Sequence, residues 1–268
     1  MIPIAPRVRR PAVAGSFYPG VADNLRAEVE AQLNAAIEAD LPPVRALIVP
    51  HAGYRFSGPV AASGFRQLTS RESGGLPTIF LLGPAHHYPV RDVALAPYDR
   101  FDTPLGSVPQ KKQVVEDMLR DPRMYQPIAS AHDPEHCLEV ELPFLQMVLG
   151  DFDLVAMLCG RTDIDRVASD LAVRVGPDDL VIVSSDLSHF YAYDQARRLD
   201  RFFLEAVLAG DFEQAAQGEA CGLQSILILM RLAQMKNWRP TLLDYRNSGD
   251  TGGDRFRVVG YAALAYTD

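Results

Sequence analysis

Three short apolar stretches, each followed closely by histidine, constrain the fold of this 268-residue chain more than any other feature. They cover residues 46–49, 78–82 and 180–183 and are rich in Val, Ile and Leu. Runs of this length that end at Gly, Pro or Ser are typical of buried strands in a parallel sheet. Ligands of open α/β sheets bind beyond the carboxyl ends of the strands. Because each run brings histidine to that edge, the sequence predicts one site built from all three.

The segments between these strands carry helical patterns or turn signals, as expected for an α/β chain. We expect helices over about 23–39, 60–68, 110–119, 132–148, 163–175, 194–208, 211–217 and 223–232, with Asp23 as the N-cap of the first. Further strands are expected near 93–96, 101–108, 124–129, 152–158, 240–245 and 257–266. No linker or fixed-period repeat divides the chain, so we predict a single α/β domain over residues 1–268, with a central largely parallel or mixed sheet flanked by helices.

Composition excludes several classes of protein. The formal net charge is −8 and no basic stripe is interleaved with aromatic residues, which argues against a nucleic-acid partner. The three cysteines form no Cys-x-x-Cys pair, so neither a disulfide framework nor a zinc ribbon is predicted. No apolar run is long enough to span a bilayer, and the N-terminus lacks the apolar core of a signal peptide. We therefore expect a cytoplasmic protein without a membrane partner.

The six histidines all lie in motifs typical of loops or strand ends, where functional residues concentrate. They are His51, His86, His87, His132, His136 and His189. Neutral imidazoles with a carboxylate suit a divalent transition metal, namely Fe(II) for two histidines and one carboxylate, or catalytic zinc for three protein ligands and water. His51 and His86 follow their strands most directly and are the strongest ligand candidates, and Asp250 is the best carboxylate candidate.

Two further pairs are candidates for catalytic roles. Asp186 and His189 lie three residues apart beyond the third strand, so they could be a base and its orienting partner or could complete a metal shell. The alternative for Asp186 is a helix N-cap. His136 and Glu139 are also three apart, on one side of an expected helix start, where they could form the far wall of the site.

Other chemistry-bearing residues have simpler interpretations. Asp250 lies in a glycine-rich loop, where it could serve only the geometry of a turn. His132 could be solvated, and a surface position is favoured for Glu141. Cys137 and Cys221 have no positive charge close in sequence that would lower their pKa, so we expect small buried residues rather than nucleophiles.

Six short motifs, taken together in their order and spacing, resemble the Memo-like family, called AmmeMemoRadiSam system protein B in prokaryotes. The family is related in fold to the class III extradiol ring-cleavage dioxygenases, and the resemblance covers nearly the whole chain. The motifs are Ala-Gly-Ser-Phe-Tyr at 14–18, Pro-His-Ala-Gly-Tyr at 50–54, Gly-Pro-Ala-His-His at 83–87, Glu-His-Cys-Leu-Glu-Val-Glu-Leu-Pro at 135–143, Ser-Ser-Asp-Leu-Ser-His at 184–189 and Gly-Tyr-Ala-Ala at 260–263.

The resemblance implies an α/β sandwich with a central mixed sheet and outer helices. It places the site on His51, His86, Asp186 and His189. Animal members have a cysteine in the loop before the final strand, taken to be a metal ligand, and Thr251 occupies that position here. Either the neighbouring Asp250 supplies the third ligand, as in a dioxygenase-like triad, or the site is altered or lost. Replacement of sulfur by oxygen disfavours copper relative to iron or zinc.

The function implied by the resemblance is that of a metal-dependent oxidoreductase, with Fe(II) as cofactor and His189 as acid and base, acting on a small aromatic or redox substrate. One alternative is a binding or scaffold module that kept the pocket. Another is a zinc-type hydrolase in which His189 or Glu139 activates water. Prokaryotic members of the family are associated with a radical-SAM protein, which is therefore a possible pathway partner.

Overall fold

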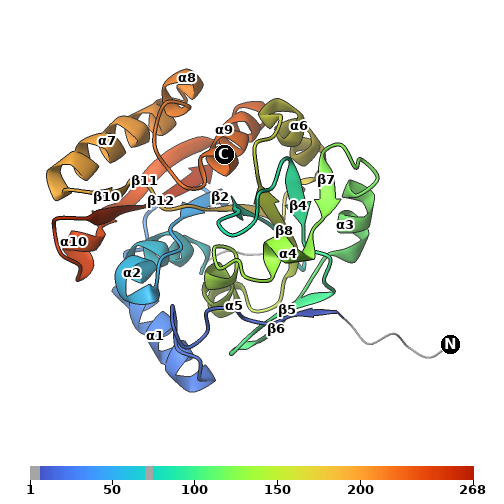
Figure 1. The fold of residues 1–268 in the computed structure, drawn as a ribbon, viewed down its shortest axis with the longest axis horizontal. Helices are drawn as coiled ribbons and strands as arrows, with labels where there is room; N and C mark the ends of the chain where they lie inside the picture. Colours follow the sequence, from blue (N-terminus) through green and yellow to red (C-terminus); the bar gives the residue numbers. More distant parts are fainter. Residues whose placement is uncertain (1–6, 70–74) are drawn as a thin grey trace.

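The three histidine strands lie side by side in the middle of a nine-stranded sheet. The computed structural model describes residues 7–69 and 75–268 (Figure 1). The strand order is β10-β12-β2-β9-β3-β8-β4-β7, and β11 pairs with β12. These strands are β2 (Val44–Val49), β3 (Thr78–Pro84), β4 (Val93–Leu95), β7 (Tyr125–Pro127), β8 (Asp153–Cys159), β9 (Leu180–Ser184), β10 (His189–Tyr191), β11 (Arg239–Asn247) and β12 (Val258–Thr267).

Strands β2, β9, β3 and β8 are parallel, so their carboxyl ends share one edge. The register aligns Val49 with Ser184, the last residues of β2 and β9. β12 runs antiparallel to β2, and β4 antiparallel to β8. The predicted central mixed sheet flanked by helices is therefore confirmed, whereas the extent of the single domain over residues 1–268 stays a prediction.

Both faces of the central strands are buried because side chains alternate between two apolar cores. In β2, Ala46 and Ile48 belong to one core and Leu47 and Val49 to the other. One core is covered by α3 (Lys112–Met118), α6 (Ile164–Arg174), α7 (Tyr193–Ala209) and α9 (Leu223–Lys236). The other is covered by α1 (Ala22–Ala35), α2 (Tyr54–Phe65) and α5 (Leu142–Leu149). Two covered faces explain why these strands read as continuous apolar runs.

Shorter elements connect these layers. A three-stranded sheet of order β1-β5-β6 lies beside the main sheet (Figure 1). The remaining elements are β1 (Val8–Arg9), β5 (Arg100–Thr103), β6 (Gly106–Pro109), α4 (Ala129–His132), α8 (Phe212–Ala215), α10 (Ser248–Thr251), and the 3₁₀ helices η1 (Arg66–Leu68) and η2 (Glu139–Glu141). Within residues 7–69 and 75–268, no helix combines the length and apolar character needed to cross a bilayer.

Three helix boundaries differ from the predictions. Helix α1 has Val21 as its N-cap, and Asp23 lies in the first turn, where a carboxylate interacts favourably with the helix dipole. Helix α2 begins at Tyr54 and contains Pro59, rather than beginning after it. The helix expected over 132–148 is broken, because α4 ends at His132 and α5 begins at Leu142 with Pro143 in its first turn. The break leaves His136 on a loop.

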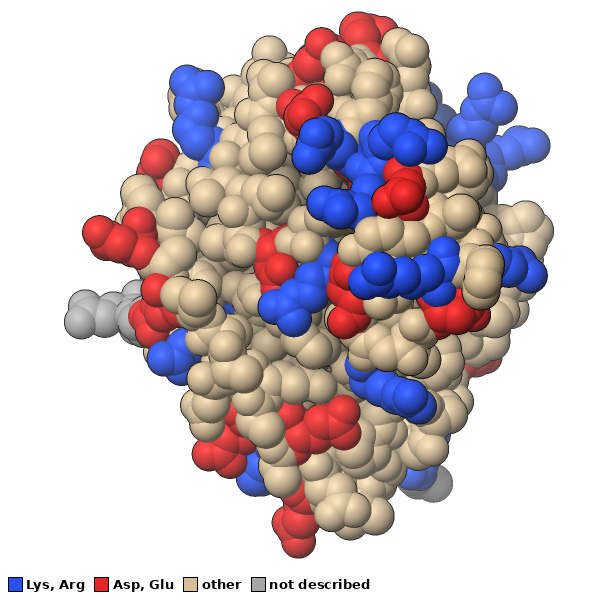
Figure 2. Space-filling view, turned by 90° about the vertical axis from the view of Figure 1, so that its left-hand side faces the viewer, with Lys and Arg blue, Asp and Glu red and all other residues tan. Residues whose placement is uncertain are grey.

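Charged residues of both signs share the surface over α7 and the end of β11. Figure 2 shows Lys and Arg side chains interspersed with Asp and Glu on this face. A cavity of about 590 Å³ there is lined by Asp194, Arg197, Arg198, Arg201 and Glu205, with Leu204, Leu208, Leu242 and Tyr245. The absence of a nucleic-acid partner stays a prediction.

His132 is buried, so the prediction of a solvated side chain is wrong. Its side chain is only 2% exposed, and Nε2 lies 3.0 Å from the carbonyl oxygen of Ala94. Burial lowers the pKa of His132 to about 4, below its ordinary value of 6.5. A neutral ring in the folded protein therefore has to be charged when the protein unfolds in mild acid.

Because the pKa is lower in the folded state, His132 contributes stability that is present above pH 6.5 and lost as pH falls towards 4. The unfolding free energy of the parent should fall between pH 7 and pH 4. In His132→Gln we expect this fall to be smaller by about 3 kcal/mol. Denaturant unfolding at several pH values measures this difference. Exposed His87→Gln is the control, expected to follow the parent. Identical pH dependence in His132→Gln and the parent would contradict the assignment.

Candidate metal centre

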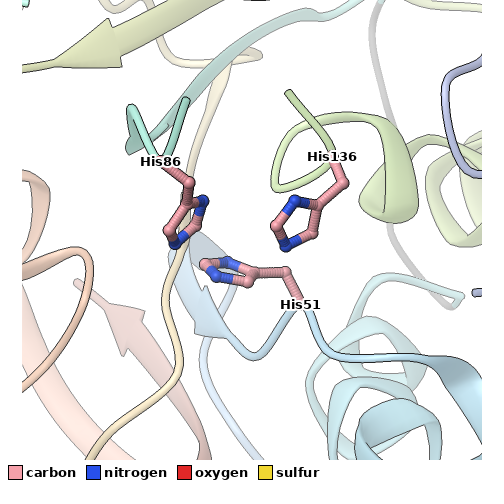
Figure 3. A group of neighbouring side chains, drawn as sticks. All are labelled: His51, His86 and His136. Atoms are coloured by element: carbon pink, nitrogen blue, oxygen red, sulfur yellow. The ribbon is translucent and has the colours of Figure 1, made fainter. Parts of the chain in front are cut away.

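Three histidines from separate segments converge at the carboxyl edge of the sheet. One ligand nitrogen from each of His51, His86 and His136 lies within 4.8 Å of the other two. His51 follows β2, His86 follows β3, and His136 comes from the loop between α4 and η2 (Figure 3). The rings of His86 and His136 stack at 4.9 Å between centroids, while His51 meets them edge-on at 5.2 and 5.5 Å. The structure brings His51 and His86 together, as predicted. It adds His136, which was expected in the far wall of the site rather than among the ligands.

Hydrogen bonds at Nδ1 orient two of the rings. Nδ1 of His51 lies 2.8 Å from Ser184 Oγ, and Nδ1 of His86 lies 2.8 Å from Glu135 Oε1. With Nδ1 engaged, Nε2 is the nitrogen left on each of these rings for a ligand. Outer hydrogen bonds of this kind are typical of metal-binding histidines, since they fix the ring and its tautomer.

The environment keeps the rings of His51 and His136 neutral. Burial lowers the pKa of His51 to about 3, and the neighbouring His86 adds to the effect. Burial likewise lowers the pKa of His136 to about 4, with repulsion from His51 as the next cause. A neutral imidazole is the form that binds a metal, so the cluster holds its donors ready at neutral pH.

Glu135 organises the cluster and was missed in the sequence, although it directly precedes His136. Its carboxylate accepts hydrogen bonds from the backbone N–H groups of His86, His136 and Cys137 at 2.6, 3.0 and 3.1 Å. Burial by itself would raise the pKa of Glu135, but the hydrogen bonds and charge of His86 outweigh burial and hold that pKa below its usual range. An ionised Glu135 therefore connects the loops that carry His86 and His136.

Asp186 contacts the cluster through His51, and His189 is near enough for its charge to act on both residues. Asp186 is buried, and its Oδ1 accepts a hydrogen bond from the backbone N–H of His51 at 2.8 Å. Burial raises the pKa of Asp186 to about 6, while the backbone bond from His51 and the charge of His189 oppose that rise. Asp186 lies in the loop between β9 and β10 and starts no helix, so the N-cap alternative is wrong. Within the described residues, no hydrogen bond joins Asp186 to His189.

The structure does not bring Asp250 into the histidine cluster. Asp250 Oδ1 accepts from the hydroxyl of Tyr193 at 2.6 Å, and Oδ2 from the backbone N–H of Asn247 at 3.0 Å. Asp250 and Asn247 form a capping box on the four-residue helix α10, which also contains Thr251. Both carboxylate oxygens are therefore used locally, and the prediction of Asp250 as third ligand is corrected in favour of its structural alternative.

Glu139 and Glu141 are both buried, at 1% and 0% exposure. Glu139 is an anchor for the N-terminal arm: it pairs with Arg9 and accepts from the Tyr18 hydroxyl at 2.6 Å. These partners occupy both carboxylate oxygens of Glu139. The structure therefore does not place Glu139 in the far wall of the site, contrary to the prediction. The surface position favoured for Glu141 is wrong, because this carboxyl contacts Ser184 at 2.7 Å beneath His51.

Cys221 lies at the rim of the cluster, directly before α9 begins. Its Sγ is 3.3 Å from His51 Nε2 and 3.2 Å from the backbone nitrogen of Asp186. Burial raises the pKa of Cys221 to about 12. The group is a thiol at neutral pH, in keeping with the expectation that it is not a nucleophile.

Comparison with known proteins agrees with the motifs. The Memo-like protein family model matches residues 9–265. A MEMO1 family protein of Sulfurisphaera tokodaii is 31% identical over 97% of this chain and 100% of its own length. Another, from Archaeoglobus fulgidus, is 34% identical over 97% of this chain and 99% of its own length. A third, from Thermotoga sp., is 34% identical over 94% of this chain and 97% of its own length.

A solved structure supports the fold alone. An uncharacterised protein of Escherichia coli K12 superimposes with a TM-score of 0.54 at 12% identity, covering 84% of this chain and 100% of that one. The family model spans nearly the whole chain, and the relatives match it over nearly their whole lengths. The chain therefore belongs to the Memo-like protein family.

Proposed function

We propose that this protein binds one divalent transition metal through His51, His86 and His136 and acts as a metal-dependent oxidoreductase on a small substrate, with Fe(II) as the metal. The observation that carries the proposal is the convergence of three imidazole nitrogens within 4.8 Å of one another. Imidazole is a common ligand for iron, zinc and copper. The ring arrangement thus supports a metal centre made of nitrogen donors.

The donor set fits such a metal. The rings of His51 and His136 are neutral, and the carboxylate of Glu135 supports the ring of His86 from behind. This carboxylate–histidine pairing raises the basicity of the ligand nitrogen. The set departs from the triad of two histidines and one carboxylate, because the third donor is His136 rather than Asp250.

Access to the cluster is one-sided. The side chains of His86 and His136 are 28% and 17% exposed, whereas His51 is 2% exposed and forms the floor. A substrate would approach from the side of His86 and His136. When bound, the metal would polarise a substrate oxygen and lower the pKa of coordinated water. Asp186, with a pKa near 6, is suited to take up a proton beside the floor.

A zinc hydrolase is the second candidate function, favoured by the same geometry. Three histidines with an open fourth position are the donor set of catalytic zinc in some hydrating enzymes. Asp186 or His189 would then accept the proton of the attacking water. The two functions use the same residues and differ in the metal.

Anaerobic purification followed by elemental analysis tests the proposal. We expect about one equivalent of iron per chain, and oxygen uptake by the Fe(II)-loaded protein in a panel of catechols. Stoichiometric zinc with hydrolysis of ester substrates and no oxygen uptake would replace the first candidate by the second. Absence of metal after reconstitution with Fe(II) and with Zn(II) would reject both, leaving a binding or scaffold module. The radical-SAM partner stays a prediction.

A further inference from the structure

Glu141 is a buried acidic side chain without an evident counter-charge. It is 0% exposed, at the junction of η2 and α5. In the described part of the chain, no ion pair involves Glu141, and its Oε2 has no hydrogen-bond partner. Its Oε1 lies 2.7 Å from the hydroxyl of Ser184, which in turn contacts His51. A carboxyl so placed needs an explanation in terms of its protonation state.

The hydroxyl of Ser184 has three partners. Its Oγ lies 2.7 Å from the carbonyl oxygen of Cys137, 2.7 Å from Glu141 Oε1 and 2.8 Å from His51 Nδ1. A serine hydroxyl carries one proton and can accept two hydrogen bonds. A carbonyl oxygen can only accept, so the Ser184 proton points to Cys137. The other two partners must then both donate to Ser184.

We infer that Glu141 is a neutral carboxylic acid in the folded protein, that it donates its proton to Ser184, and that this bond fixes His51 in the Nδ1–H tautomer. Glu141 is therefore a positioning residue for His51 and acts through Ser184. In this tautomer Nε2 carries the lone pair, which faces the Cys221 thiol at 3.3 Å. That this lone pair serves a metal rests on the proposed function.

The surroundings of Glu141 oppose its ionised form. Burial raises the pKa of Glu141 well above its usual value. The hydrogen bond with Ser184 acts in the opposite direction but is outweighed, and the nearby carboxylate of Asp186 adds to the rise. Tyr54 also lies close, but its hydroxyl donates to the carbonyl oxygen of Val140 at 2.6 Å. An ionised Glu141 would accept the hydrogen bond of the Ser184 hydroxyl. The carbonyl oxygen of Cys137 would then face a lone pair of Ser184 Oγ at 2.7 Å.

Infrared difference spectroscopy of Glu141→Gln against the parent tests the protonation state. At pH 7 the parent is expected to show the C=O stretch of a protonated carboxyl group, shifted in D₂O and lost in Glu141→Gln. Exposed Glu30→Gln is the matched control, expected to lose carboxylate bands instead. Loss of carboxylate bands in Glu141→Gln would overturn the inference.

The tautomer can be measured without altering Glu141. Nitrogen-15 NMR of histidine-labelled parent protein distinguishes a protonated Nδ1 from a protonated Nε2, and His51→Gln assigns the signal. We expect the proton of His51 on Nδ1. A proton on Nε2 would overturn the inference, whether or not any Glu141 variant folds.

Zinc affinity, measured by chelator competition, separates this inference from the proposed function. Ser184→Ala and Glu141→Ala are expected to bind Zn(II) about tenfold more weakly than the parent, as for loss of an outer hydrogen bond. Glu141→Gln, whose amide can still donate to Ser184, is expected to stay within about twofold. A tenfold loss in Glu141→Gln would contradict the positioning role. A parent that binds no metal would reject the proposed function while the infrared and NMR results still decide the state of Glu141.

Discussion

Replacing His136 with Ala is expected to abolish stoichiometric metal binding, whereas Asp250→Ala is expected to leave it unchanged. His136 offers a ligand nitrogen within 4.8 Å of those of His51 and His86. Asp250 uses both carboxylate oxygens to cap α10 and to bind Tyr193. If the three histidines are the ligands, as proposed, removal of one leaves a two-donor site that would hold a divalent metal weakly. Elemental analysis after dialysis measures both variants beside the parent.

His87→Ala is the matched control for His136→Ala. His87 neighbours His86 in the chain and is exposed, but it is not among the three clustered histidines. We expect its metal content to equal that of the parent. Circular dichroism of each variant shows whether a loss of metal reflects unfolding. Full metal in His136→Ala together with loss in Asp250→Ala would restore the triad of two histidines and one carboxylate.

Replacing Glu139 with Ala is expected to lower the unfolding free energy by about 3–5 kcal/mol, the usual result of leaving a buried charge unpaired. Its partner Arg9 is 2% exposed and also donates to the carbonyl oxygens of His132 and Glu135. Glu139 further accepts from the backbone N–H of Ala12 at 2.7 Å and of Val13 at 3.0 Å. The substitution therefore leaves the guanidinium and the arm without their shared acceptor.

Neighbouring arginines provide the comparison for this pair. Arg9→Ala should destabilise the protein about as much as Glu139→Ala, whereas Arg10→Ala should change the unfolding free energy by less than about 1 kcal/mol. The side chain of Arg10 is 83% exposed and lies 3.9 Å from Asp102. Denaturant unfolding measures all three variants. Equal effects of Arg9→Ala and Arg10→Ala on the unfolding free energy would show that the buried ion pair stabilises the protein no more than an exposed one.

The strands and their shared edge could be predicted because they depend on local sequence. Apolar runs report burial on both faces, and the strand-end rule then places His51 and His86 together. A local signal for Asp250 was also present, since Asn247 and Asp250 have the three-residue spacing of a capping box. The interpretation as a metal ligand overlooked this simpler use of the carboxylate.

The roles of Glu139 and Glu141 could not be predicted from local sequence. Each depends on a partner distant along the chain, Arg9 for Glu139 and Ser184 for Glu141. Surface exposure is the usual state of glutamate, and only the tertiary contacts reveal these exceptions. His136 joined the cluster because the expected helix is interrupted, and no strand-end pattern marks that loop.

The position of β9 between β2 and β3 has a consequence for biosynthesis. The first two histidine strands do not pair with each other, because β9, which begins only at Leu180, lies between them and pairs with both. Until the ribosome has synthesised and released residue 184, the strands that carry His51 and His86 lack the strand that pairs with both. Such distant pairings form slowly, because a long loop must close first. We expect metal capture to follow completion of the sheet, so that metal cannot act as an early nucleus for folding.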